Sequence, residues 1–232
     1  SYEEIRRAPG SGGDISRILM GLPSLAKVND QSNSLIVRGG SPVENGFFVD
    51  NIEVPNINHF PAQGSSGGPI GLLNVDFIQD VNFHTGGFSS MYGDKLSSIL
   101  DVTFREGNRE EIDVQAELSF AGVGAVAEGP LLSKNGSWLI SARRSYVDLL
   151  LNAVGAKGVA VRYGDYQGKF VYDLNPDNTM TLVAISGYDH SDADKDHGEI
   201  IYGSNNVWEN TVGLNWRSLW GKEGYSNTSL AY

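Results

Sequence analysis

The stretch Leu73–Arg105 reads LNVDFIQDVNFHTGGFSSMYGDKLSSILDVTFR. Apolar and polar residues alternate over most of its first third, which is typical of a strand with one buried face. Ile78 breaks that alternation, so we expect a bend or a β-bulge near Gln79-Asp80. Gly86-Gly87 should end the strand, because adjacent glycines favour backbone conformations with positive φ. A second alternating run, Ile99–Phe104, predicts another strand.

This arrangement of strand, glycine turn and strand resembles the end of the plug domain of TonB-dependent outer-membrane receptors. Plug domains there carry a glycine-rich turn, an aromatic residue, a Tyr-Gly pair and a final strand that ends in Thr or Arg. The matching residues are Phe77–Val81, Gly86-Gly87-Phe88, Met91-Tyr92-Gly93 and Leu100–Phe104. The sequence departs from the commonest plug pattern at residues 83–88 and 96–99. Those departures resemble a Bacteroidetes-like subgroup of receptors for surface nutrients.

Two upstream segments resemble further plug motifs, in the family's order. Arg38-Gly39-Gly40 follows a short apolar strand and is similar to the Ile-Arg-Gly motif. Phe47–Pro55 is similar to a Val-Asp-Gly-Val-Pro motif, with Asn51 in the turn position that usually holds glycine. Three ordered motifs are more specific than any one alone. The plug-motif residues that the resemblance implies are Arg38, Gly39, Gly40, Asp50, Asn51, Gly86, Gly87, Tyr92 and Gly93.

A short helix and a long loop complete the expected N-terminal part. Asp14 is a plausible N-cap, Ile15–Leu22 carries an apolar face at helical spacing, and Pro23 ends the helix. Residues 56–71 are rich in Gly, Ser, Pro and Asn and predict a loop. Such a loop is more often a plain connector, but the plug resemblance implies an apical loop that faces the ligand. The ligand-facing candidates are Asn58, His59, Phe60 and Gln63.

Beyond Gly107 the pattern changes to amphipathic strands. Residues 112–120 alternate strictly, as in a strand with one face in lipid or core and the other in water. The connections at 133–136, 175–178 and 221–224 are short, whereas those at 147–161 and 189–205 are long. Because outer-membrane barrels have short periplasmic turns and long external loops, we expect the long loops on the extracellular side. A soluble sandwich with aromatic corners remains an alternative for this half.

The expected fold class is therefore an α+β plug domain followed by antiparallel transmembrane β-barrel strands. We place the plug domain at 1–107 and the N-terminal barrel strands at 108–232. The 125 residues after Gly107 provide roughly six to eight strands, whereas the receptor family closes with about 22. A fragment of a larger 22-strand barrel is thus expected, and reuse of a plug elsewhere is the alternative. Ser1–Glu4 does not resemble a signal peptide, so a processed or truncated N-terminus is also expected.

Composition argues against several functions. The net charge of −11 disfavours nucleic acid as a partner, because phosphate binding needs a basic face. The chain has no cysteine and therefore no disulfide or thiolate site. Its four histidines lie in expected loops or at a strand end, outside any catalytic motif. We expect neither enzymatic activity nor a cofactor.

Two charged clusters are candidate sites. Asp192, Asp194 and Asp196 have the spacing of a calcium loop, but His197 and Gly203 replace the glycine and glutamate that such a loop requires. A solvated acidic loop is the preferred interpretation, so no metal site is expected. Arg143-Arg144 could pair with Glu106 or Asp101 of the plug, although a basic pair facing the lumen or the interface is the more ordinary interpretation.

The resemblance implies TonB-dependent uptake of a scarce nutrient across the outer membrane of a Gram-negative bacterium, with the plug gating the barrel lumen. It implies the TonB complex, outer-membrane lipid and a nutrient ligand as partners, with a surface lipoprotein or a larger channel as further candidates. The alternative is a plug-like binding subunit that occludes or gates another protein's outer-membrane channel without transporting anything. A secreted glycan-binding sandwich is a third hypothesis, but it would not account for three plug motifs.

Overall fold

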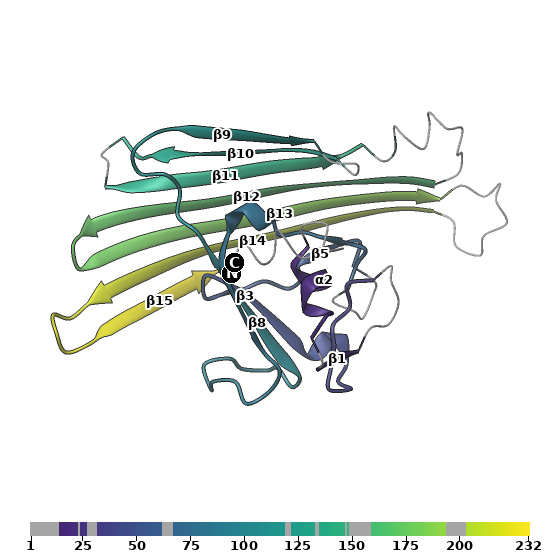
Figure 1. Ribbon diagram of the computed structural model, residues 1–232, viewed down its shortest axis with the longest axis horizontal. Coiled ribbons are helices and arrows are strands. Elements are labelled where there is room, and N and C mark those ends of the chain that lie inside the picture. Colours follow the sequence, from purple (N-terminus) through teal and green to yellow (C-terminus); the bar gives the residue numbers. More distant parts are fainter. Residues whose placement is uncertain are drawn as a thin grey trace.

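The computed structural model contains two parts, a wide sheet of long strands and a smaller α+β body packed on one face of that sheet (Figure 1). The described residues are 14–22, 24–26, 32–61, 67–118, 122–132, 135–146, 148, 159–193 and 203–232. We call the seven-stranded sheet the wall and the described residues up to Phe104 the N-terminal body. No helix in those ranges is long and apolar enough to cross a bilayer.

The wall is an antiparallel meander in which every strand pairs with its sequence neighbours, in the order β15-β14-β13-β12-β11-β10-β9. Its strands are β9 Asp113–Leu118, β10 Gly122–Pro130, β11 Gly136–Ser145, β12 Val159–Asn175, β13 Asn178–Ala193, β14 Gly203–Leu219 and β15 Tyr225–Ala231. This antiparallel pairing agrees with the strands expected from the alternating pattern.

Three of the wall strands are longer than the sequence predicts. β12 and β14 have 17 residues each and β13 has 16, so they run into the segments expected to be loops at 147–161 and 189–205. Residues 189–193 lack apolar alternation, yet each of them pairs with both neighbouring strands. At about 3.3 Å per residue, 17 residues extend well beyond a hydrocarbon layer about 30 Å thick. Polar strand ends outside the layer need no apolar face, which is why alternation does not reveal them.

The N-terminal body is built on a four-stranded sheet of order β4-β3-β8-β7, in which β3 and β8 run parallel. Its strands are β3 Asn45–Val49, β4 Ile52–Glu53, β7 Ile78–His84 and β8 Ser98–Phe104. The remaining elements are α2 Ile15–Leu19, η1 Pro42–Glu44, η2 Val75–Phe77 and the strand pairs β1 Leu25–Ala26 with β2 Ile36–Val37 and β5 Asn58–His59 with β6 Ile70–Gly71. The body therefore mixes short helical turns with a small mixed sheet, as expected for an α+β domain.

The stretch that begins at Leu73 folds largely as its pattern predicts. The register of β7 on β8 shifts between Ile78 and Asp80, which confirms the expected bulge. Gly86 and Gly87 both have positive φ, at 129° and 65°. Val75–Phe77 differs, because it forms the 3-10 turn η2 instead of strand. The Asn74 side chain accepts a hydrogen bond from the Asp76 amide and so caps a helical turn in competition with the extended form.

The N-terminal helix is shorter than its apolar pattern suggests. Asp14 caps α2 as expected, its side chain accepting from the Ser16 amide at 2.9 Å. The helix ends at Leu19, three residues before the expected end, with Gly21 in the following turn. Glycine in that turn favours termination, because it carries a high entropic cost inside a helix.

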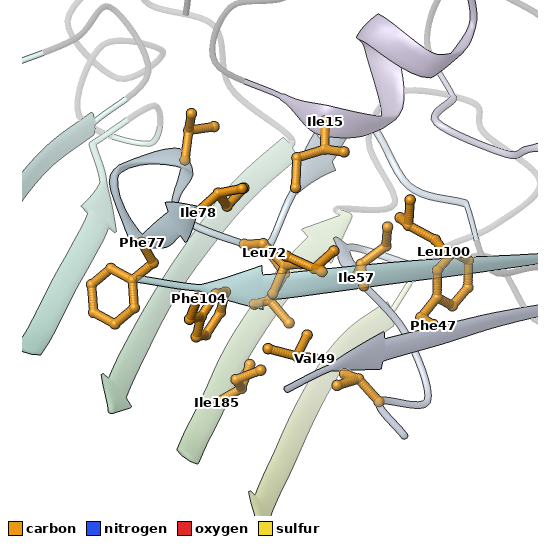
Figure 2. Close-up of a cluster of buried hydrophobic side chains, with 14 of the residues drawn as sticks. Ile15, Phe47, Val49, Ile57, Leu72, Phe77, Ile78, Leu100, Phe104 and Ile185 are labelled. Atoms are coloured by element: carbon orange, nitrogen blue, oxygen red, sulfur yellow. The ribbon is translucent and has the colours of Figure 1, made fainter. Parts of the chain in front are cut away.

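The hydrophobic core is shared by the two parts. Phe77 and Phe104 are fully buried and meet edge to face, with ring centroids 5.3 Å apart. Figure 2 shows them with Val49 of the body and Ile185 of the wall, whereas Leu100 lies farther along β8, beside Phe47. Leu139 and Val183 of the wall belong to the same cluster. Packing of the body on the wall therefore completes a single core.

The two faces of the wall differ in chemistry. Along β12, Asp165, Gln167 and Lys169 are buried against the N-terminal body, whereas the intervening Tyr166 and Phe170 are 61% and 39% exposed. On this stretch of β12 polar side chains thus face the body and aromatic side chains face away from it, whereas Leu139, Val183 and Ile185 of the neighbouring strands add apolar contacts with the body. This is the inside-out pattern of a strand with lipid on one side and a polar interior on the other.

Candidate functional site

The candidate site is the polar seam between the N-terminal body and the wall, and His59 lies at its centre. His59 belongs to β5 and is 1% exposed. Its Nδ1 atom lies 2.6 Å from Asp189 Oδ1 on β13, and its Nε2 atom lies 3.2 Å from Asp165 Oδ2 on β12. The imidazole is therefore held between carboxylates of two adjacent wall strands.

Asp165 connects this histidine to an arginine. Arg143 on β11 donates from Nε to both oxygens of Asp165 at 3.0 Å. A terminal nitrogen of its guanidinium also donates to the carbonyl oxygens of Gly71 at 3.0 Å and Leu72 at 2.6 Å. Arg143 thus binds a wall carboxylate and plug-side backbone, not the Glu106 or Asp101 weighed from the sequence. The neighbouring Arg144 is exposed.

The charge state of His59 follows from its surroundings. Burial by itself lowers the pKa of His59, but the hydrogen bonds and charges of Asp165 and Asp189 outweigh burial and raise that pKa above its ordinary value. A neutral imidazole donates from one nitrogen only, whereas an imidazolium donates from both. Since both ring nitrogens face carboxylate oxygens, the geometry fits the imidazolium form.

A second polar contact lies at the Asp50-Asn51 turn. Both residues have positive φ, at 47° and 65°, as expected for a tight turn without glycine. The Asp50 carboxylate lies 3.0 Å from the ammonium of Lys169, which also donates to the Phe104 carbonyl at 2.5 Å. Asn215 of β14 donates to the Asp50 carbonyl at 2.6 Å. This turn is therefore fastened to two wall strands.

Backbone amides of the N-terminal body bind further wall side chains. The Asn56 amide donates to Glu209 at 3.0 Å, the Phe60 amide donates to Asp189 Oδ2 at 2.7 Å, and the Asn74 amide donates to Gln167 at 3.1 Å. These hydrogen bonds satisfy backbone amides of irregular segments, which have no hydrogen-bond partner on a neighbouring strand.

The remaining plug-motif residues gather away from this seam. A Cβ atom added at Gly86 would lie 3.2 Å from a terminal nitrogen of Arg38, so the two motifs are in contact. Arg38 and Gly39 both have positive φ, at 50° and 80°. Gly40 packs against Ser97, and Gly87 and Gly93 have open space around them. Tyr92 donates to Asp101 at 3.2 Å, and burial raises the pKa of that carboxyl.

The structure separates the ligand-facing candidates. Asn58 and His59 are buried, with Asn58 accepting from Asn33 at 3.0 Å. Phe60 is half-buried and packs edge to face on Tyr163, with centroids 6.3 Å apart. Gln63 lies outside the described residues. The expectation that these residues face a ligand stays a prediction, although the contacts of His59 assign its side chain to the seam and Asn58 bonds within the N-terminal body.

The calcium candidate is described only in part. Asp192 lies on β13 opposite Ser204 and is exposed, whereas Asp194 and Asp196 lie outside the described residues. Within the described ranges no group of three His, Cys, Asp or Glu side chains is arranged to hold a metal ion.

Sequence reasoning missed the wall side of the seam. The missed residues are Asp165, Gln167, Lys169, Asp189 and Glu209. A signal was present on β12, where Asp165, Gln167 and Lys169 alternate with Tyr166, Gly168 and Phe170. A polar face in an otherwise apolar strand predicts a polar lumen or a polar partner, but it does not predict which partner.

Residues 1–98 match the family model of the TonB-dependent Receptor Plug Domain. The chain is 30% identical over 103 residues to the TonB-dependent transporter Oar of Myxococcus xanthus, a match that covers 44% of this chain and 9% of that protein.

Solved structures match the whole chain. The siderophore receptor PirA from Acinetobacter baumannii has 15% identity and a TM-score of 0.70, covering 100% of this chain and 38% of that one. The ferric enterobactin receptor PfeA from Pseudomonas aeruginosa, in a mutant form, has 16% identity and a TM-score of 0.67, covering 100% and 39%. The outer membrane transporter YddB from Escherichia coli has 14% identity and a TM-score of 0.67, covering 100% and 38%.

These matches confirm the fold class expected from the sequence, a plug domain followed by antiparallel barrel strands. They also confirm the expected location, the outer membrane of a Gram-negative bacterium. Most of the N-terminal body lies within the residues that match the plug model, so we call it the plug below, and the wall has the fold of part of the matched receptor barrels. The chain spans less than half the length of the solved structures and a tenth or less of the curated relative that it matches.

Proposed function

We propose that this chain, with its TonB-dependent receptor plug domain, belongs to an outer-membrane receptor that takes up a scarce nutrient in a TonB-dependent manner. The observation that carries the proposal is the plug match at 1–98 together with a polar seam that seats the plug on the inward face of the wall. A wide barrel encloses water, so a domain that fills it must be held by polar contacts that can rearrange.

The proposed domain division is plug at 1–107 and barrel strands at 108–232. It is supported by the end of the plug sheet at Phe104 and the start of the wall at Asp113. The intervening segment is tied down by Arg105, whose guanidinium donates to both oxygens of Glu128 at 2.7 Å. The proposed partners are the TonB complex, outer-membrane lipid and a nutrient ligand.

The nutrient class is also part of the proposal. Departures from the commonest plug pattern at residues 83–88 and 96–99 support a Bacteroidetes-like receptor for surface nutrients. The matched solved structures include siderophore receptors, and their low identity bears on the fold alone.

Uptake by the full-length receptor should depend on TonB. We expect a strain that expresses the receptor to accumulate its labelled nutrient, tested over a panel of ferric siderophores, cobalamin and oligosaccharides. Deletion of TonB should reduce that accumulation to the level of a strain without the receptor, because the plug stays seated unless it is pulled.

Two outcomes would contradict the proposal. One is accumulation that is unchanged without TonB for every compound that the receptor takes up. The other is a native polypeptide close to 25.1 kDa that copurifies with a larger channel, which is the result expected of a plug-like gating subunit.

A further inference from the structure

Both strands of the short β5–β6 pair are linked to the wall carboxylate of Asp165. His59 of β5 contacts Asp165 directly, at 3.2 Å. The carbonyl oxygen of Gly71 in β6 accepts from Arg143, which itself binds Asp165. Asp165 is fully buried, so solvent does not screen its charge. Both strands of the pair are therefore fixed at one point of the wall.

The second carboxylate, Asp189, holds a strained residue. Phe60 follows His59 and has a φ of 54°, a region that bulky side chains rarely adopt. Its amide donates to Asp189 Oδ2 at 2.7 Å, while His59 Nδ1 lies 2.6 Å from Asp189 Oδ1. Such strain persists only where the surroundings hold it in place. The contact with Asp189 therefore opposes a natural tendency of this backbone to relax.

The charges around His59 come closer to balance if its ring carries a proton on each nitrogen. The groups that face it are Asp165 and Tyr163 from β12, Asp189 from β13, Glu209 from β14 and Arg143 from β11. With a neutral ring, one nitrogen lone pair would point at a buried carboxylate, and Arg143 would be the one cation left beside the three acidic groups. A buried charge that loses its partner is strongly destabilising.

We propose that His59 is a positioning residue whose second proton holds the β5–β6 pair on the wall, so that loss of this proton releases the pair. As a statement about uptake it rests on the proposed function, because release of this strand pair would be one step of plug movement. As a statement about attachment it can be measured without nutrient or TonB.

The direction of the pH effect follows from the linkage between protonation and attachment. The pKa of His59 is raised in the folded protein, chiefly because the contributions of Asp165 and Asp189 outweigh burial. A group with a raised pKa contributes fully below its unfolded value, near 6.5, and its contribution is lost as the pH rises through the folded value. Attachment should therefore be complete in mild acid and should weaken in mild alkali.

Hydrogen–deuterium exchange of the full-length receptor in lipid nanodiscs tests this inference. The amides to follow are Phe60, which donates to Asp189, and Leu72, which donates to Ile57, with the amides of β8 as internal reference. After correction for intrinsic exchange, we expect the protection of Phe60 and Leu72 to fall by about tenfold or more, relative to β8, between pH 6 and pH 9.

Two variants separate the proton from mere packing. In Asp189→Asn, the new amide can donate to a neutral ring and its oxygen can still accept from Phe60, so the protection should change less than about threefold over the same range. His59→Gln removes the titrating group and should also give a flat profile. His84→Gln, at an exposed histidine of the plug, should keep the wild-type profile.

The inference is overturned if the wild-type protection is flat with pH. It is equally overturned if His59→Gln or Asp189→Asn retains the wild-type fall. Either result leaves the proposed uptake function untouched, because the exchange measurement uses no nutrient and no TonB. Conversely, if the receptor shows this pH profile but its uptake does not depend on TonB, the uptake proposal is contradicted and the inference about attachment stands.

Discussion

Replacing Asp165 with alanine is expected to weaken the seating of the plug on the wall by about 3–5 kcal/mol, the usual cost of removing one partner from a buried charge network. Asp165 is fully buried and accepts from Arg143 at 3.0 Å and from His59 at 3.2 Å. Its loss leaves the guanidinium without its carboxylate and lowers the number of carboxylates around His59 by one. The same substitution removes the carboxylate to which both strands of the β5–β6 pair are linked, although His59 keeps its contact with Asp189.

A urea titration of the full-length receptor measures this effect. The 232-residue chain contains no cysteine, so a fluorophore on one cysteine placed in the 86–97 loop reports on the plug alone if the rest of the receptor also lacks cysteine. With an m-value of about 1–3 kcal/mol/M, the midpoint of the plug transition should fall by at least about 1 M.

Asp173→Ala is the matched control, because Asp173 lies on the same strand. Its ion pair with Arg109, at 2.6 Å, joins side chains that are 33% and 37% exposed. A partly exposed pair contributes about 0–1 kcal/mol, so the control should shift the midpoint much less. Equal shifts for the two variants would show that burial of the Asp165 network does not govern the seating of the plug.

Replacing Phe104 with alanine is expected to destabilise the plug by about 3–5 kcal/mol, the range for deleting a buried aromatic ring. Phe104 is 0% exposed and packs on Phe77 at 5.3 Å. It lies in the core that the plug shares with the wall, as Figure 2 shows for Ile185. The cavity left by the ring therefore weakens both the fold of the plug and its packing on the barrel.

The same titration serves this variant, with Phe170→Ala as its control. Phe170 is a phenylalanine of β12 on the outward face and is 39% exposed. Since its ring does not contact the plug core, the plug transition should stay within experimental error of the wild type. A plug midpoint that is unchanged in Phe104→Ala would contradict the shared core.

The elements that the sequence predicted well are those decided by neighbouring residues. The bulge at Ile78, the glycine turn at Gly86-Gly87 and the strand Ile99–Phe104 all depend on local alternation or on backbone freedom. The Asp50-Asn51 turn is of the same kind. The capped turn at Val75–Phe77 is not predicted by alternation, because the side chain of Asn74 caps a helical turn where the apolar pattern favours a strand.

The site could be predicted only in part, because its contacts join distant parts of the chain. His59 meets Asp189 across 130 positions and Asp165 across 106. No local pattern distinguishes a loop histidine that faces solvent from one that is inserted between two strands. The polar face of β12 predicts a polar interior. Which plug residue contacts that face, here His59, depends on how the plug packs against the wall.

The most direct test of the account is a disulfide between plug and wall in native outer membranes. A Cβ atom added at Gly213 of β14 would lie 2.5 Å from Cδ1 of the buried Ile52, so cysteines at these positions are within disulfide reach. We expect Ile52→Cys with Gly213→Cys to form a disulfide on mild oxidation, with loss of thiol labelling. The pair Ile52→Cys with Val207→Cys should stay reduced, because Val207 lies roughly 20 Å farther along the same strand. Free thiols in the first pair, or equal cross-linking in both pairs, would contradict a plug seated on the inward face of this wall.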